Sequence, residues 1–123
     1  MIKSLDSFPD NVVALIAEGR VTRKDYEQVV IPNVEAALKR HEKIRLYYEL
    51  GSQFSGIDAG AAWEDFKTGF EHLPRWERVA VVTDVDWISH MVKAFGFLMP
   101  GHVRVFGTAQ NNDAKTWILE KQA

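Results

Sequence analysis

Short apolar runs, each ended by polar or turn residues, recur along the chain and alternate with stretches of helical spacing. The runs at residues 11–17, 43–50 and 78–84 are rich in Val, Ile and Tyr and are too short for helices. They therefore predict three buried strands, none with an internal glycine. A fourth strand is predicted at 102–106, and residues 2–5 can pair as an edge strand across the turn that follows them.

The first helix is predicted to begin at Thr22, because Asp25 lies three residues on and can complete a capping box. Apolar residues at helical spacing continue this pattern to residue 38. Pro32 lies inside it and must kink the helix or break one of its hydrogen bonds.

Three further helices are predicted from the same spacing. The second begins at Asp58 and the third near Asp86. A short last helix covers residues 113–122 after a cap at Asn111 and Asn112. Strands that alternate with helices indicate an α/β domain with a largely parallel sheet under helical cover.

Composition sets the class of protein. The chain has 123 residues, no cysteine, and 15 basic against 17 acidic residues. The size predicts a single domain over residues 1–123, and the lack of cysteine fits a reducing compartment. The charge balance gives no support to nucleic-acid binding. The first ten residues turn polar too early for a signal peptide, and no apolar run approaches the roughly 20 residues of a membrane span. We expect a cytoplasmic protein.

The loop at residues 51–60, GSQFSGIDAG, is the first candidate for chemistry. It lacks the lysine and glycine spacing of phosphate-binding loops, and the Asp58 carboxylate would occupy the N–H groups that an anion needs. No G-x-S-x-G elbow surrounds Ser55 or Ser89. No pair of histidines has metal-ligand spacing. The scattered histidines are His41, His72, His90 and His102. The sequence therefore predicts no enzyme, no metal site and no cofactor.

The second and third helices carry more aromatic and apolar residues than one sheet face can cover. Phe97 in particular must point away from its neighbours, since successive helical residues are 100° apart. Gly60 and Gly69 weaken the second helix, so it could act as a moving lid. The simpler alternative is that these residues are ordinary core. The candidate ligand-binding residues are Trp63, Phe66, Phe70, Trp87, Met91, Phe95, Phe97 and Leu98.

These segments, taken in order, resemble the SpoIIAA-like proteins of the STAS superfamily. The resemblance rests on RVTRKDYEQVVIPNVEAAL, KIRLYYELGSQFSGIDAGAAWEDFK, RVAVVTDVDWISHMVKAFGFLMPGHVRVF and the closing Trp-Ile helix. It implies a mixed five-stranded sheet whose first strand is antiparallel, with four helices. It also implies similarity to CRAL-TRIO lipid carriers, for which an apolar ligand between helices is proposed.

The loop departs from the family at the position of its regulatory switch. Anti-sigma antagonists have an S-x-x-D-S-S-G pattern there, with a phosphorylatable serine after the aspartate. Ser55 and Asp58 match this pattern, but Ala59 and Gly60 replace both serines. Neither replacement has a hydroxyl group. The loop therefore keeps the helix-entry pattern and has lost the phosphate acceptor.

The leading hypothesis is a non-enzymatic domain that binds an apolar or lipid-like ligand and associates with membranes peripherally. Arg75, Arg78 or Lys93 could then meet an anionic head group. The alternative is a regulatory protein-interaction module, in which the same apolar surface docks a protein partner or a second copy of the chain.

Overall fold

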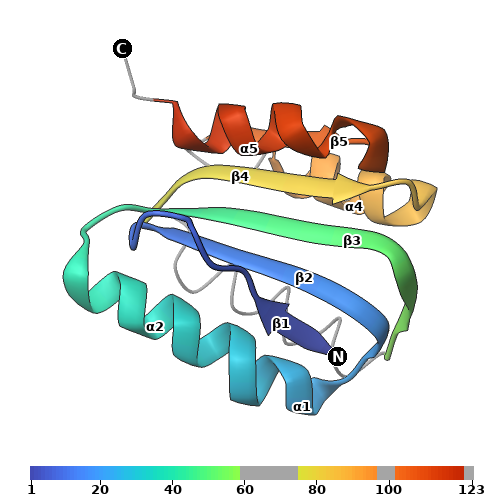
Figure 1. Cartoon of the computed structure of the whole chain (residues 1–123), viewed down its shortest axis with the longest axis horizontal. Coiled ribbons are helices and arrows are strands. Elements are labelled where there is room, and N and C mark those ends of the chain that lie inside the picture. Colours follow the sequence, from blue (N-terminus) through green and yellow to red (C-terminus); the bar gives the residue numbers. More distant parts are fainter. Residues whose placement is uncertain (59–74, 97–101, 121–123) are drawn as a thin grey trace.

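A five-stranded mixed sheet forms the centre of the computed structural model, which describes residues 1–58, 75–96 and 102–120. The strands follow chain order across the sheet (Figure 1). β1 is antiparallel to β2, and all later neighbours are parallel. The strands are β1 (Ile2–Ser4), β2 (Val12–Val21), β3 (Ile44–Ile57), β4 (Trp76–Thr83) and β5 (His102–Phe106). The predicted fold class is confirmed.

Helices cover both faces of this sheet. The first predicted helix is continuous but is built of three parts, and the third and last predicted helices are also present. The second, expected from Asp58, lies outside the described residues. The helical elements are α1 (Arg23–Asp25), the π-helical η1 (Tyr26–Val30), α2 (Ile31–Arg40), α4 (Asp86–Gly96), the 3-10 turn η3 (Thr108–Gln110) and α5 (Asn111–Leu119).

The start of the first helix confirms the predicted capping box. The backbone N–H of Thr22 donates to the Asp25 carboxylate at 2.8 Å. Pro32 lies in the first turn of α2, directly after the π-helical turn, where Ile31 N–H donates to the carbonyl of Tyr26 five residues back. Proline has no N–H and its ring collides with the carbonyl four residues back, so an unbroken α-helix cannot run through it. The chain resolves this conflict by widening one turn.

Alternation along the strands divides the core into two layers. On β3, the buried Tyr48 belongs to one layer and the buried Tyr47 to the other. The first layer packs against η1, α2 and α4, and the second packs against α5. Figure 1 shows α2 and α5 on opposite sides of the sheet. Successive side chains of a strand point to opposite faces of the sheet. A strand that contributes to both core layers must therefore be apolar on both faces, which is why its sequence is a nearly continuous apolar run.

The strands are longer than predicted at their carboxyl ends. β2 continues to Val21 and β3 to Ile57, and their register shifts on either side of Gly19. Gly19 has a φ of 61°, a value that costs other residues strain, and it forms a bulge. The expectation that no strand contains an internal glycine is therefore wrong for these extensions.

The last helix begins earlier than predicted. α5 starts at Asn111 rather than at residue 113, and the 3-10 turn η3 leads into it. Gly107 N–H donates to the side-chain oxygen of Gln110 at 3.2 Å. The turn from Gly107 to Gln110 therefore leads directly into the first turn of α5. The predicted cap at Asn111 and Asn112 is wrong, because those residues already lie within the first turn.

Arginines close the carboxyl end of α5. Arg45 is 6% exposed and donates to the carbonyl oxygens of Ile118 and Glu120 at 2.8 and 2.5 Å. The same guanidinium donates to Glu77 at 2.5 Å. Arg78 donates to the carbonyl of Trp117 at 2.6 Å. The last carbonyls of a helix lack intrahelical partners and carry partial negative charge, so these contacts fix α5 to the sheet.

Candidate functional site

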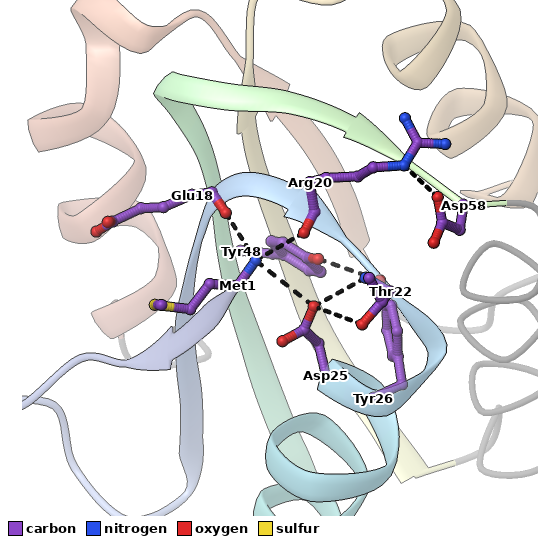
Figure 2. A network of polar contacts seen from close by, with 8 residues as sticks. All are labelled: Met1, Glu18, Arg20, Thr22, Asp25, Tyr26, Tyr48 and Asp58. Atoms are coloured by element: carbon purple, nitrogen blue, oxygen red, sulfur yellow. Dashed lines mark hydrogen bonds and ion pairs between the residues drawn. The ribbon is translucent and has the colours of Figure 1, made fainter.

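Polar side chains gather where β2 and β3 end, and Figure 2 shows them as one network. Because β2 to β5 are parallel, their carboxyl ends share one edge of the sheet, which is where open α/β sheets bind ligands. The Arg20 side chain crosses from β2 and forms an ion pair with Asp58. A Cβ atom at Gly56 would lie 3.5 Å from the guanidinium of Arg20, and Gly56 has a φ of 156°. That distance is an ordinary contact, so the φ value, rather than the space for Arg20, is what favours glycine there.

The Arg20–Asp58 pair changes the interpretation of Asp58. Its backbone N–H donates to the carbonyl of Val21 at 2.9 Å, so the residue ends the β2–β3 ladder. Its carboxylate pairs with a cation, a contact that the sequence did not predict. The helix cap expected at Asp58 stays a prediction. The N–H groups that it would cap belong to residues outside the described ranges. Ser55 lies three residues earlier on β3 and is exposed.

The second half of the network surrounds Asp25. Its carboxylate accepts hydrogen bonds from the N–H and hydroxyl of Thr22 and lies 3.5 Å from the α-ammonium of Met1. That ammonium donates to the carbonyls of Glu18 and Arg20 at 2.7 and 2.8 Å. Burial acts to raise the pKa of Asp25, but the hydrogen bonds from Thr22 and the nearby ammonium outweigh it and lower that pKa.

The lowered pKa of Asp25 predicts a loss of stability in acid. A carboxyl group whose pKa is lower in the folded chain contributes stability above its unfolded value, about 3.9. That contribution disappears as the pH falls through the folded value. Asp25→Asn should therefore be less stable than the wild type at neutral pH, and the difference should shrink below about pH 4. Urea unfolding at several pH values measures it, and a difference independent of pH would contradict the account.

Two buried tyrosines lie beneath this network. The hydroxyl oxygens of Tyr26 and Tyr48 are 3.1 Å apart, although both side chains belong to the apolar layer. Tyr26 is the first residue of the π-helical turn η1. Single π-helical turns occur frequently at functional sites. The pair therefore places hydroxyl groups inside the core, and Figure 2 shows the two tyrosines beside the Thr22–Asp25 contacts.

A second group of hydrogen bonds joins the segments that follow β4 and β5. Asp84 follows β4 and accepts a hydrogen bond from Thr108 N–H at 3.0 Å and another from the Thr108 hydroxyl. These two bonds lower the pKa of Asp84. A Cβ atom at Gly107 would lie 3.3 Å from the Asp84 carboxylate, so glycine makes room for the contact.

α4 begins at this edge and exposes part of its apolar surface. Ile88 is 3% exposed and Val92 packs against the same layer. Trp87 is 51% exposed and Met91 is 40% exposed. The apolar residues expected on this helix are therefore divided between an inward stripe and an outward pair. We call Trp87 and Met91 the α4 apolar pair.

Most of the other predicted ligand-binding residues cannot be placed. The side chain of Phe95 is not described. The following predicted site residues lie outside the described ranges: Ala59, Gly60, Trp63, Phe66, Phe70, Phe97 and Leu98. Their roles stay predictions.

The cations proposed for an anionic head group have different surroundings. Arg75 donates to the carbonyls of Leu38, His41 and Glu42, and so closes the carboxyl end of α2. Arg78 is engaged at α5. These two arginines stabilise helix ends. Lys93 is exposed on α4.

Over residues 1–58, 75–96 and 102–120, no three His, Cys, Asp or Glu side chains come together as metal ligands. Within the same ranges, no helix is long and apolar enough to cross a membrane.

Arg20, Tyr26 and Tyr48 were missed as site residues by sequence reasoning. Tyr48 was visible only as part of an apolar strand, and Tyr26 as part of an apolar helix face. Arg20 follows a glycine at the end of a strand, which is no specific signal. Its partner Asp58 lies 38 residues away in the chain.

Comparison with known proteins agrees with this architecture. The profile of the SpoIIAA-like family matches residues 12–119. Comparison with curated proteins found no significant match. Among solved structures, a similar one is the crystal structure of an uncharacterized protein from the DUF3478 family with a SpoIIAA-like fold, from Shewanella loihica PV-4. It shares 26% sequence identity at a TM-score of 0.72, over 95% of this chain and 93% of that chain. Because this profile covers residues 12–119 and the sheet has the mixed order described above, the chain belongs to the SpoIIAA-like family.

Proposed function

We propose that this domain is a non-enzymatic binding module whose α4 surface takes up an apolar or lipid-like ligand. In this proposal the protein works in the cytoplasm and contacts membranes peripherally. The exposed α4 apolar pair, Trp87 and Met91, is the observation that carries the proposal. Regulation by phosphorylation at the family's switch position is not part of this proposal, because Ala59 and Gly60 have no hydroxyl group to carry a phosphate.

The arrangement of α4 suits an amphipathic surface. At 100° per residue, Trp87, Met91 and the exposed Ala94 fall on one narrow stripe, while Ile88 packs inward. Lys93, about 120° from Trp87 around the helix axis, lies on the polar face of α4. Tryptophan and lysine in this relation are common where one side of a helix meets lipid and the other meets water.

The exposed area is large enough to matter for binding. A tryptophan buries roughly 250 Å² at most, so a side chain that is 51% exposed leaves on the order of 100 Å² to cover. At about 25 cal/mol per Å², covering it is worth about 2–3 kcal/mol. Met91 adds a flexible, polarisable side chain that can adapt to ligands of different shape.

Vesicle binding tests the proposal. The double variant Trp87→Ser/Met91→Ser should bind phosphatidylcholine–phosphatidylglycerol vesicles at least about tenfold more weakly, since it removes this apolar area. Leu119→Ser is the matched control, because Leu119 is 46% exposed but lies on α5, on the opposite side of the sheet. Co-sedimentation measures binding, and thermal unfolding checks that both variants fold. Equal binding by the double variant and the control would refute the α4 site.

A protein partner is the second candidate function. The α4 apolar pair supports it too, because exposed aromatic and methionine side chains are enriched at protein interfaces. The simplest partner is a second copy of the chain. If vesicles fail to bind, sedimentation equilibrium of the wild type and the Trp87→Ser/Met91→Ser variant decides this case. Self-association that the double variant abolishes, and Leu119→Ser retains, would favour the interaction module.

A further inference from the structure

A pocket of about 200 Å³ lies at the opposite end of the sheet from the candidate site. It opens between the β1–β2 connection, residues 5–11, and the last turns of α2. Figure 1 shows this connection and the carboxyl end of α2 together at the left, whereas α1 and the carboxyl ends of β2 and β3 lie at the right. The pocket therefore belongs to neither the polar network nor the α4 apolar pair.

Small residues and an unusual turn create the hollow. α2 presents Ala36 and Ala37 to it, and neither fills the space up to the facing connection. In that connection Ser7 has a φ of 73°, which is uncommon for any residue except glycine. Val12 N–H donates to the carbonyl of Pro9 at 3.0 Å and holds the turn in place. Backbone strain of this kind concentrates at functional sites.

Opposite charges lie side by side at the rim of the pocket. Asp10 Oδ2 is 3.7 Å from Arg40 Nη1, and Asp10 Oδ1 is 3.4 Å from His41 Nε2. Both distances exceed those of good charged hydrogen bonds. The Asp10 and Arg40 side chains are 65% and 69% exposed, so little stability depends on their contact. Each group can take a new partner at small cost.

Polar and apolar groups contribute about equally to the lining of the pocket. Leu5 and Phe8 line it, and both pack against the second core layer. The ring of Phe8 is held 5.3 Å from that of Tyr47. The wall also contains a fixed polar group, since Asn33 donates to Ser4 Oγ at 3.2 Å and to the carbonyl of Val29 at 2.6 Å. Apolar side chains beside convergent polar groups suit a ligand that has both an apolar and a charged part.

We propose that this pocket binds a small amphipathic zwitterion, of which a free amino acid with an apolar side chain is the simplest example. Its ammonium group contacts Asp10, its carboxylate contacts Arg40, and its side chain packs on Leu5 and Phe8. The volume equals that of roughly seven water molecules, which suits a molecule of amino-acid size. A ligand with only one charge would leave either Asp10 or Arg40 without a new partner.

Three matched probes separate the charge contacts. L-phenylalanine carries both charges, phenylpropionate lacks the ammonium group, and phenethylamine lacks the carboxylate. Calorimetric titration should show that phenylalanine binds at least about tenfold more tightly than either relative, since each loses a charged contact. Amide NMR shifts on adding phenylalanine should fall on residues 5–11 and 33–40.

Variants of the rim and wall complete the test. Asp10→Asn should weaken phenylalanine binding about tenfold and leave phenylpropionate unchanged. Arg40→Gln should weaken both and leave phenethylamine unchanged. Ala36→Phe fills the pocket from an exposed helix position and should abolish all binding, while Lys39→Gln on the same helix is the control. Absence of phenylalanine binding up to its solubility limit would overturn the proposal. Binding that survives Ala36→Phe, or amide shifts confined to α4, would also overturn it.

Discussion

Arg45→Met should destabilise the domain by about 3–5 kcal/mol, the usual cost of removing one partner from a buried ion pair. The Arg45 side chain is 8% exposed and that of its partner Glu77 is 20% exposed, so the variant leaves a mostly buried carboxylate without its cation. It also removes the donor to the carbonyls of Ile118 and Glu120. For a domain of this size the melting temperature should fall by roughly 10–20 °C.

Two controls separate the buried pair from a general effect of lost charge. Arg104→Met removes an exposed arginine of the same sheet, and it should change the free energy of unfolding by less than about 1 kcal/mol. Adding Glu77→Gln to Arg45→Met should recover part of the loss, because the unpaired carboxylate is then gone. Urea unfolding of the wild type, Arg45→Met, Glu77→Gln and the double variant measures the coupling, and Arg104→Met is compared with them. If Arg45→Met cost no more than Arg104→Met, the buried pair would have no structural role.

Trp117→Ala should cost about 3–5 kcal/mol, the range observed when a large aromatic is removed from a core. The Trp117 ring is 9% exposed and lies 6.0 Å from that of Phe106. The guanidinium groups of Arg78 and Arg104 lie 5.0 and 5.4 Å from its centre. α5 is the described helix on this side of the sheet, so losing the ring weakens its attachment directly.

The neighbouring Leu119 gives the control for this substitution. It is 46% exposed on the same helix, so Leu119→Ala should change stability by no more than about 0.5 kcal/mol. Trp117→Phe should fall between the two, because it keeps an aromatic ring for the stacked cations. Urea unfolding followed by circular dichroism measures all three. A Trp117→Ala loss as small as that of Leu119→Ala would show that α5 is held by its arginine contacts alone.

The central strands were predictable because their signal is local. Residues 44–50 and 79–83 are short runs rich in β-branched, aromatic and other apolar residues, and most of them are buried. The extensions of β2 and β3 beyond these runs were not predictable. Glycines such as Gly19 and Gly56 normally indicate a turn. In this sheet Gly19 forms a bulge in β2, and Gly56 pairs with Arg20 within the β2–β3 ladder.

The candidate site was predictable only in part. The third helix and its apolar residues follow from spacing alone. Which of them face outward depends on the neighbours of α4, so sequence could not separate Trp87 and Met91 from Ile88. Arg78 illustrates the same limit. The sequence suggested that Arg78 binds an anionic head group. In the structure it donates to the carbonyl of Trp117 on α5.

The sequence by itself determined the class of sheet, the capping box at Thr22 and the loss of both switch hydroxyls at Ala59 and Gly60. Each of these depends on residues close together in the chain or on residue identity alone. Only the tertiary structure decided the Arg20–Asp58 pair and the attachment of Arg45 to α5, whose partners lie 38 and 73 residues away. Such contacts form only after the core has packed and set the distances between elements, because a charged side chain finds its partner within a few ångströms of space rather than of sequence.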